Sequence, residues 1–181
     1  MSVDVVMQTE FPAGYVVFFG TDGKVLMTPR SEEHSSTIKS MQIDSLSLGR
    51  HAKTASDVYL DFPADENSAP DFAILREDAQ RQGKRYGFED VLLIAEVVPV
   101  SSARKDYDDC TAKYGRYGIP VYVVVDPYAA EVVVHTQPTG SGYIAAHTHK
   151  YGSGKLPIEL ADGRTYTLDL DELPQPEADG H

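Results

Sequence analysis

Two apolar segments separated by a helical pattern constrain the fold of this chain more than any other feature. Residues 91–98 are apolar except for Glu96, and residues 119–127 are rich in valine. Continuous apolar runs of this length are typical of strands that are covered on both faces of a sheet. Between them, residues 101–118 carry tyrosine and cysteine at helical spacing and end at a glycine. Strand, crossover helix and strand together predict a parallel pair inside an α/β sheet.

Further strand and helix patterns flank this unit on both sides. The Asp-Gly pair at residues 22–23 predicts a hairpin turn between two short strands near the N-terminus. Ser31 is a candidate N-cap and Gly49 a candidate C-terminal glycine of a helix. The predicted apolar stripe of that helix consists of Ile38, Met41, Ile43, Leu46 and Leu48. Further strands are predicted at residues 57–62, 71–75, 131–136, 142–152 and 164–170. The expected fold is a mixed central β-sheet flanked by helices, with an N-terminal hairpin and a β-rich C-terminal part.

The bulk properties narrow the class of protein. A chain of 181 residues suits one domain, which we predict at residues 1–173, followed by a disordered acidic tail at residues 174–181. No apolar run is long enough to span a membrane, and no signal peptide is visible. The single cysteine, Cys110, excludes an internal disulfide and fits a reducing cytoplasm. The net charge of -12 disfavours DNA as a partner, although residues 81–85 form a small basic segment.

Two carboxylates fall at positions where burial is costly. Asp71 begins a predicted strand after a proline, and Glu96 lies inside the first apolar run. An unpaired ionised carboxylate in a sheet needs a partner, a cation or contact with water. If the two strands are neighbours, both carboxylates and a main-chain carbonyl such as that of Val97 would suit Mg²⁺ or Mn²⁺. The alternative is that Glu96 pairs with Arg104 or Lys105 and that Asp71 only caps a turn.

Four segments in a fixed order carry a resemblance to a known family: APDFAIL, VLLIAEVV, SSARKDYDDCTAKYGRYGIPVYVVVDP and EVVVHT. They resemble the Uma2 type of bacterial endonucleases, in the PD-(D/E)xK restriction-endonuclease-like superfamily, over residues 14–173. The resemblance implies a restriction-endonuclease-like core in which Asp71 and Glu96 hold the metal ion. It also implies a lysine that orients the attacking water and stabilises charge during phosphodiester hydrolysis.

The chain departs from this pattern at the lysine. Val98 stands two residues beyond Glu96, and Cys110 holds the helix position where the family usually has a lysine. Lys113 lies one helical turn beyond Cys110, and Lys24 replaces an acidic residue of the family, so both are candidates for the missing amine. Cys110 itself is interpreted as a small core residue rather than a nucleophile, and with His34 it is a candidate for a residue that supports the site from behind.

Two functions remain open on these residues. The first is a metal-dependent nuclease with a rearranged active site. The second is a degenerate nuclease fold that is repurposed for small-molecule chemistry or for protein or ligand binding. His34 is either a residue that supports the site from behind or part of a helix cap. Alternate histidines at His147 and His149 are interpreted as a solvent-facing strand edge. The resemblance suggests a homodimer through an exposed sheet edge.

Overall fold

The computed structural model describes residues 15–19, 25–29, 31–65, 68–99 and 106–176. The helices and strands are β1 (Tyr15–Phe19), β2 (Val25–Pro29), α2 (Glu32–Asp44), the 3₁₀ turn η1 (Ser45–Leu48), β3 (Lys53–Ala55), β4 (Leu60–Asp61), η2 (Pro63–Asp65), β5 (Phe72–Leu75), β6 (Tyr86–Gly87), η3 (Phe88–Asp90), β7 (Val91–Val97), α3 (Asp106–Arg116), β8 (Val121–Asp126), β9 (Glu131–Thr139), β10 (Gly142–Lys150), β11 (Lys155–Glu159) and β12 (Thr165–Asp169).

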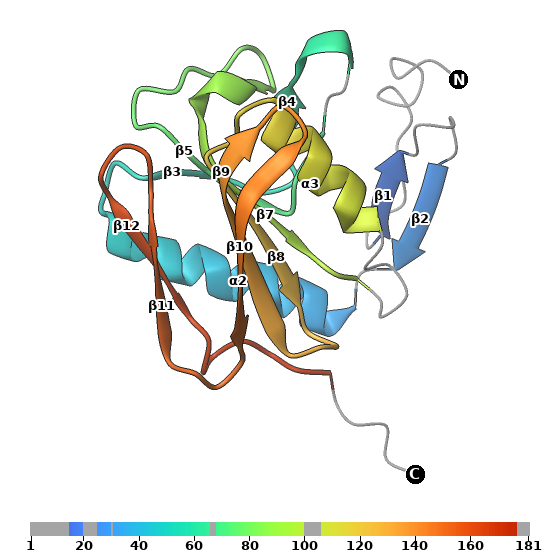
Figure 1. Ribbon diagram of the computed structural model, residues 1–181, viewed down its shortest axis with the longest axis vertical. Helices are drawn as coiled ribbons and strands as arrows, with labels where there is room; N and C mark the ends of the chain where they lie inside the picture. Colours follow the sequence, from blue (N-terminus) through green and yellow to red (C-terminus); the bar gives the residue numbers. More distant parts are fainter. Residues whose placement is uncertain (1–14, 20–24, 30, 66–67, 100–105, 177–181) are drawn as a thin grey trace.

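A six-stranded mixed sheet forms the centre of the molecule, in the order β10-β9-β8-β7-β5-β3 (Figure 1). Its one parallel pair within the described residues is β7 with β8, and the remaining neighbours are antiparallel. The predicted strand–helix–strand unit is therefore confirmed, with α3 as the crossover helix. The N-terminal hairpin of β1 and β2 and the β-rich C-terminal part, which includes the β11–β12 hairpin, are confirmed as well.

Separate apolar clusters cover the two faces of the sheet. On one face, Ile38 and Met41 of α2 pack with Phe72, Leu93 and Tyr166, so that α2 and the β11–β12 hairpin form one layer. On the other face, α3 is the covering helix, and its cluster is Ala73, Ile94, Val98, Tyr114, Tyr122 and Val124 with their neighbours. Because side chains alternate along a strand, Glu96 shares the α3 face with Ile94 and Val98. Figure 1 shows α2 and α3 on opposite sides of the sheet.

The helix predicted from Ser31 begins as expected, but its apolar stripe is partly wrong. The Ser31 hydroxyl accepts a hydrogen bond from the His34 N–H at 3.1 Å, as an N-cap does. Ile38 and Met41 are buried, whereas Ile43 and Leu46 are 55% and 75% exposed. The buried side continues instead through Ser45, four residues after Met41, so Ile43 and Leu46 fall off the buried stripe.

Two strand predictions need correction. The strand expected at residues 57–62 is reduced to β4, because Asp57 has a positive φ of 54° that interrupts an extended chain. The sheet edge is instead occupied by β3, which pairs with β5. The strand β11 was not predicted; it pairs with β12, and its alternating burial places Leu156 and Ile158 inside.

Helix α3 approaches β10 very closely. A Cβ atom at position 115 would lie 2.1 Å from the carbonyl oxygen of Gly142, so only glycine fits there. The helix ends at Arg116, and Gly118, two residues later, turns the chain away with a φ of 75°. This backbone contact fixes how far α3 stands from the sheet and therefore where Tyr114, the preceding residue, reaches.

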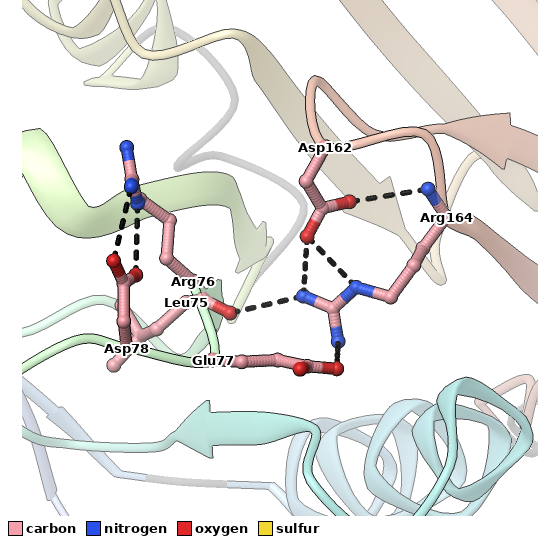
Figure 2. A network of polar contacts seen from close by, with 6 residues as sticks. All are labelled: Leu75, Arg76, Glu77, Asp78, Asp162 and Arg164. Atoms are coloured by element: carbon pink, nitrogen blue, oxygen red, sulfur yellow. Dashed lines mark hydrogen bonds and ion pairs between the residues drawn. The ribbon is translucent and has the colours of Figure 1, made fainter.

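An exposed network of charges ties the β11–β12 turn to the end of β5 (Figure 2). The guanidinium of Arg164 lies 2.7 Å from Asp162 Oδ2 and donates to the carbonyl oxygen of Leu75 at 3.3 Å. Its remaining nitrogen lies 3.5 Å from Glu77 Oε1. Beside it, Arg76 forms two hydrogen bonds to the Asp78 carboxylate, at 3.0 and 3.1 Å.

The predicted domain bounds and the tail stay predictions, since residues 177–181 lie outside the described part. None of the described helices has both the length and the apolar character that a membrane crossing requires.

Candidate active site

The register of two antiparallel strands brings Asp71 and Glu96 together. Phe72 of β5 pairs with Ala95 of β7, so Asp71, one residue earlier, stands opposite Glu96. The Asp71 N–H donates to Glu96 Oε2 at 3.3 Å. The two carboxylates therefore lie together where β7 ends, as the sequence prediction required for a shared site.

The Asp71 carboxylate is held on one of its two oxygens. Asp71 is only 4% exposed, and its Oδ2 accepts hydrogen bonds from the Val97 N–H at 2.8 Å and from His34 Nε2 at 3.2 Å. Within the described part of the chain, its other oxygen, Oδ1, accepts no hydrogen bond. The carboxylate is thus fixed in orientation while Oδ1 is left for another ligand.

Glu96 is held by a tyrosine of the crossover helix. The Tyr114 hydroxyl donates to Glu96 Oε1 at 2.9 Å and lies 3.3 Å from Ser68 Oγ. Glu96 is half-buried as a residue, but protein atoms surround its carboxylate. Burial, and secondly the charge of Asp71, raise the pKa of Glu96 well above its ordinary value, against the hydrogen bond from Tyr114. Burial and the charge of Glu96 likewise raise the pKa of Tyr114.

Among the described lysines, Lys113 is one whose charge acts on this pair. Its Nζ lies 4.9 Å from the centroid of the Phe62 ring and 5.5 Å from that of the Tyr114 ring. Its positive charge acts on Glu96 by lowering the pKa of that carboxyl group. Lys113 therefore lies on the same side of the sheet as Glu96, held over aromatic rings.

The two positions where the family pattern has lysine are apolar or half-buried. Val98 is buried in the core under α3. Cys110 is half-buried and packs against the same cluster, one helical turn before Tyr114, in agreement with its interpretation as a small core residue. Lys24, the second candidate for the amine, lies outside the described residues, as do Arg104 and Lys105.

Sequence reasoning missed two residues of this site and left one undecided. Tyr114 and Ser68 were not predicted near the carboxylates; the helical stripe of tyrosines indicated only the side of α3 that Tyr114 occupies. His34 was predicted either to support the site or to take part in a helix cap. Its N–H donates to Ser31 and its ring lies 3.2 Å from Asp71 Oδ2, while its role in a functional site stays a prediction. The His34 ring is buried, and its Nδ1 has no hydrogen-bond partner among the described residues.

The donors around the pair suit a small divalent cation. Carboxylate oxygens are hard ligands of the kind that Mg²⁺ and Mn²⁺ prefer. Here two carboxylates lie close together where burial disfavours two adjacent negative charges, and Asp71 Oδ1 accepts no hydrogen bond from the described residues. No cluster of three or more His, Cys, Asp or Glu side chains with metal-binding geometry occurs in the described ranges. The arrangement therefore fits a metal bound by two acids and completed by main-chain oxygen or water.

Comparisons with known proteins agree with this architecture. The family model "Uma2: Putative restriction endonuclease" matches residues 18–168. Among solved structures, a "putative nuclease belonging to DUF820" from Anabaena variabilis ATCC 29413 aligns with a TM-score of 0.67 and 14% identity, over 96% of this chain and 97% of that chain. At that identity the likeness shows the fold alone. The comparison with curated proteins finds no match.

Proposed function

The chain belongs to the Uma2 restriction-endonuclease family, and on that premise we propose that it is a metal-dependent nuclease that hydrolyses phosphodiester bonds at Asp71 and Glu96. The observation that carries the proposal is the proximity of Asp71 and Glu96, whose side chain accepts the Asp71 N–H and whose pKa the Asp71 charge raises, together with an Asp71 oxygen that takes no hydrogen bond within the described chain. Mg²⁺ or Mn²⁺ is the proposed ion.

The chain's own residues have separate roles in this proposal. Asp71 and Glu96 hold the ion, with the carbonyl of Val97 as a further ligand. His34 and the Val97 N–H orient Asp71, and Tyr114 orients Glu96. When bound, a divalent ion supplies Lewis-acid stabilisation of phosphate charge and lowers the pKa of a water molecule.

Lys113 is the proposed source of positive charge toward the scissile phosphate. Its influence on Glu96 and its position over Phe62 and Tyr114 support this role. A lysine ammonium near a developing phosphate charge stabilises the transition state. Lys24 remains the second candidate for this amine.

Specific observations also favour the second candidate function, a fold that has lost hydrolysis and binds another molecule. Apolar Val98 and half-buried Cys110 occupy the two positions expected to hold lysine, and the net charge of -12 opposes the approach of DNA. In this alternative, Asp71 and Glu96 are retained without the cation that hydrolysis needs.

Cleavage of plasmid DNA at low ionic strength separates the two functions. We expect cutting by the wild-type chain with Mg²⁺ or Mn²⁺, and a loss of about 100-fold or more in Asp71→Ala. Asp162→Ala, which removes a surface carboxylate of the Arg164 network, should cut like the wild type.

The same cleavage assay on Cys110→Lys, which restores the family's usual residue, is the second part of the test. If the wild type does not cut and Cys110→Lys does, the wild type is a degenerate nuclease. Absence of cutting by both chains at every metal concentration would contradict the nuclease proposal and leave the binding function.

A further inference from the structure

Among the described residues, no strand pairs with the outer edge of β10, the last strand of the central sheet. It spans Gly142–Lys150, and β9 is its one strand neighbour in the part of the chain that the structure describes (Figure 1). Ile144 on this strand is 74% exposed. Natural proteins usually shield an edge of this length with charge, proline or a covering segment, or pair it with another chain.

The direction of the unpaired backbone groups follows from two hydrogen bonds. The Val98 N–H donates to the Val125 carbonyl, so the backbone N–H and C=O groups of the odd-numbered residues of β8 point toward β7. The backbone groups of its even-numbered residues therefore point toward β9. The Tyr151 N–H donates to the Ala130 carbonyl, which continues the β9–β10 ladder. Both observations place the backbone groups of Ala145, His147 and His149 toward β9. The groups of Ala146, Thr148 and Lys150 consequently point outward, away from the sheet.

The charge on this edge also differs from that of the rest of the chain. No Asp or Glu occurs between Glu131 and Glu159, although the chain carries 28 acidic residues. On a molecule of net charge -12, two copies of a strand that carries no acidic residue of its own meet with less repulsion than two acidic segments would. Lys150, at the end of the strand, is already paired with Glu131 at 2.8 Å.

We propose that a second copy of this chain pairs with the free edge of β10, antiparallel and about a two-fold axis at Ala146. In this register Ile144 of one copy lies opposite Thr148 of the other, and Ala145 lies opposite His147. Registers centred on His147 or Thr148 would place histidines opposite one another, so they are disfavoured. The pairing extends the six-stranded sheet of each copy into one continuous sheet, and it does not depend on the proposed nuclease activity.

Sedimentation equilibrium of the full chain tests the interface. The wild type should have twice its monomer mass of 19.9 kDa. Ile144→Lys should raise the dimer dissociation constant by about tenfold or more, because it removes an apolar side chain from each copy. The matched control is Leu46→Lys, since Leu46 is 75% exposed but lies on η1; this variant should remain a dimer.

Ala146→Pro provides an independent test of the backbone pairing. Proline at an outward-facing position of an edge strand leaves the β9 pairing intact but removes the N–H offered to the second copy. This variant should be a folded monomer by circular dichroism and sedimentation. A monomeric wild type, a dimer that persists in Ile144→Lys, or a monomer produced by Leu46→Lys instead would each overturn the proposal.

Discussion

Carboxylates are held in two different ways in this molecule. In the surface network of Figure 2, Asp162 and Asp78 each face an arginine, and Arg164 also binds a main-chain carbonyl. In the candidate site, Asp71 and Glu96 face each other, and their hydrogen-bond donors are backbone N–H groups, a tyrosine and a histidine.

The difference appears in the pKa values. The hydrogen bond from Arg164 lowers the pKa of Asp162, whereas burial and Asp71 raise the pKa of Glu96. A carboxylate with its own arginine is already compensated and stabilises the fold. A buried pair of carboxylates without its own arginine repels itself, and a bound proton or metal cation would reduce that repulsion. The type of partner, and not the number of neighbours, therefore distinguishes a carboxylate that stabilises the fold from one that is a candidate metal ligand.

The largest expected effect is the response to metal. Mn²⁺ at about 100 times its dissociation constant should stabilise the wild-type chain by about 2.7 kcal/mol. Asp71→Ala should lose this stabilisation, and Asp162→Ala should keep it. Thermal unfolding with and without Mn²⁺ measures both, and equal stabilisation of the two variants would remove the distinction between the regions.

The next effect concerns the surface network itself. Arg164 has a side chain that is 19% exposed and joins Asp162, Glu77 and the Leu75 carbonyl. Arg164→Ala should lower the free energy of unfolding by about 1–2 kcal/mol, because these partners lose a charged donor. Urea denaturation measures the change; metal binding by Arg164→Ala should match the wild type.

A smaller effect is the dependence of folding stability on pH, which has opposite signs for Glu96 and Asp162. The pKa of Glu96 is raised above 4.5, so the folded state binds its proton more tightly, and the stability contributed by this group falls as pH rises from 4.5 toward the folded pKa. The pKa of Asp162 is lowered below 3.8, so its contribution is present above that pH and is lost as pH falls through the folded pKa.

Variants measured without metal separate these two dependences of stability on pH. Glu96→Gln should abolish the decline above pH 4.5, and Asp162→Asn should reduce the loss of stability in acid. Denaturation midpoints from pH 3 to 8 give the measurement. A decline above pH 4.5 that is unchanged in Glu96→Gln would show that Glu96 is not its source.

The smallest effect is expected at Arg76. Its pair with Asp78 is well exposed, with side-chain exposures of 53% and 70%. Exposed ion pairs add little to stability in water. Arg76→Ala should therefore unfold at the same denaturant concentration as the wild type; a clear loss would indicate that this part of the network acts together with Arg164.

Local sequence signals were sufficient for much of the fold. The N-terminal hairpin pairing, the Ser31 cap and the apolar runs around α3 depend on neighbours in the chain, and these predictions were confirmed; the Asp-Gly turn itself lies outside the described residues. Asp57 was missed because a positive φ at aspartate leaves no mark in an apolar pattern. Ile43 and Leu46 misled the prediction because apolar type alone does not tell a buried residue from an exposed one.

The candidate site was predictable only in part, for a similar reason. Asp71 and Glu96 were expected to converge because their strands were expected to be neighbours, and the structure places them opposite each other. The contact of Tyr114 with Glu96 depends on how closely α3 packs on the sheet, which no local pattern encodes. Whether these acids bind metal stays a prediction.

Gly115 has a consequence for anyone who redesigns this protein. It carries no charge and touches no carboxylate, so a scan restricted to polar residues would pass over it. Yet a single methyl group there has no room against the backbone of Gly142, so it would push α3 away from β10. The Tyr114 hydroxyl, which donates to Glu96, would move with the helix. The precision of the acidic pair thus rests on the smallest side chain in its vicinity.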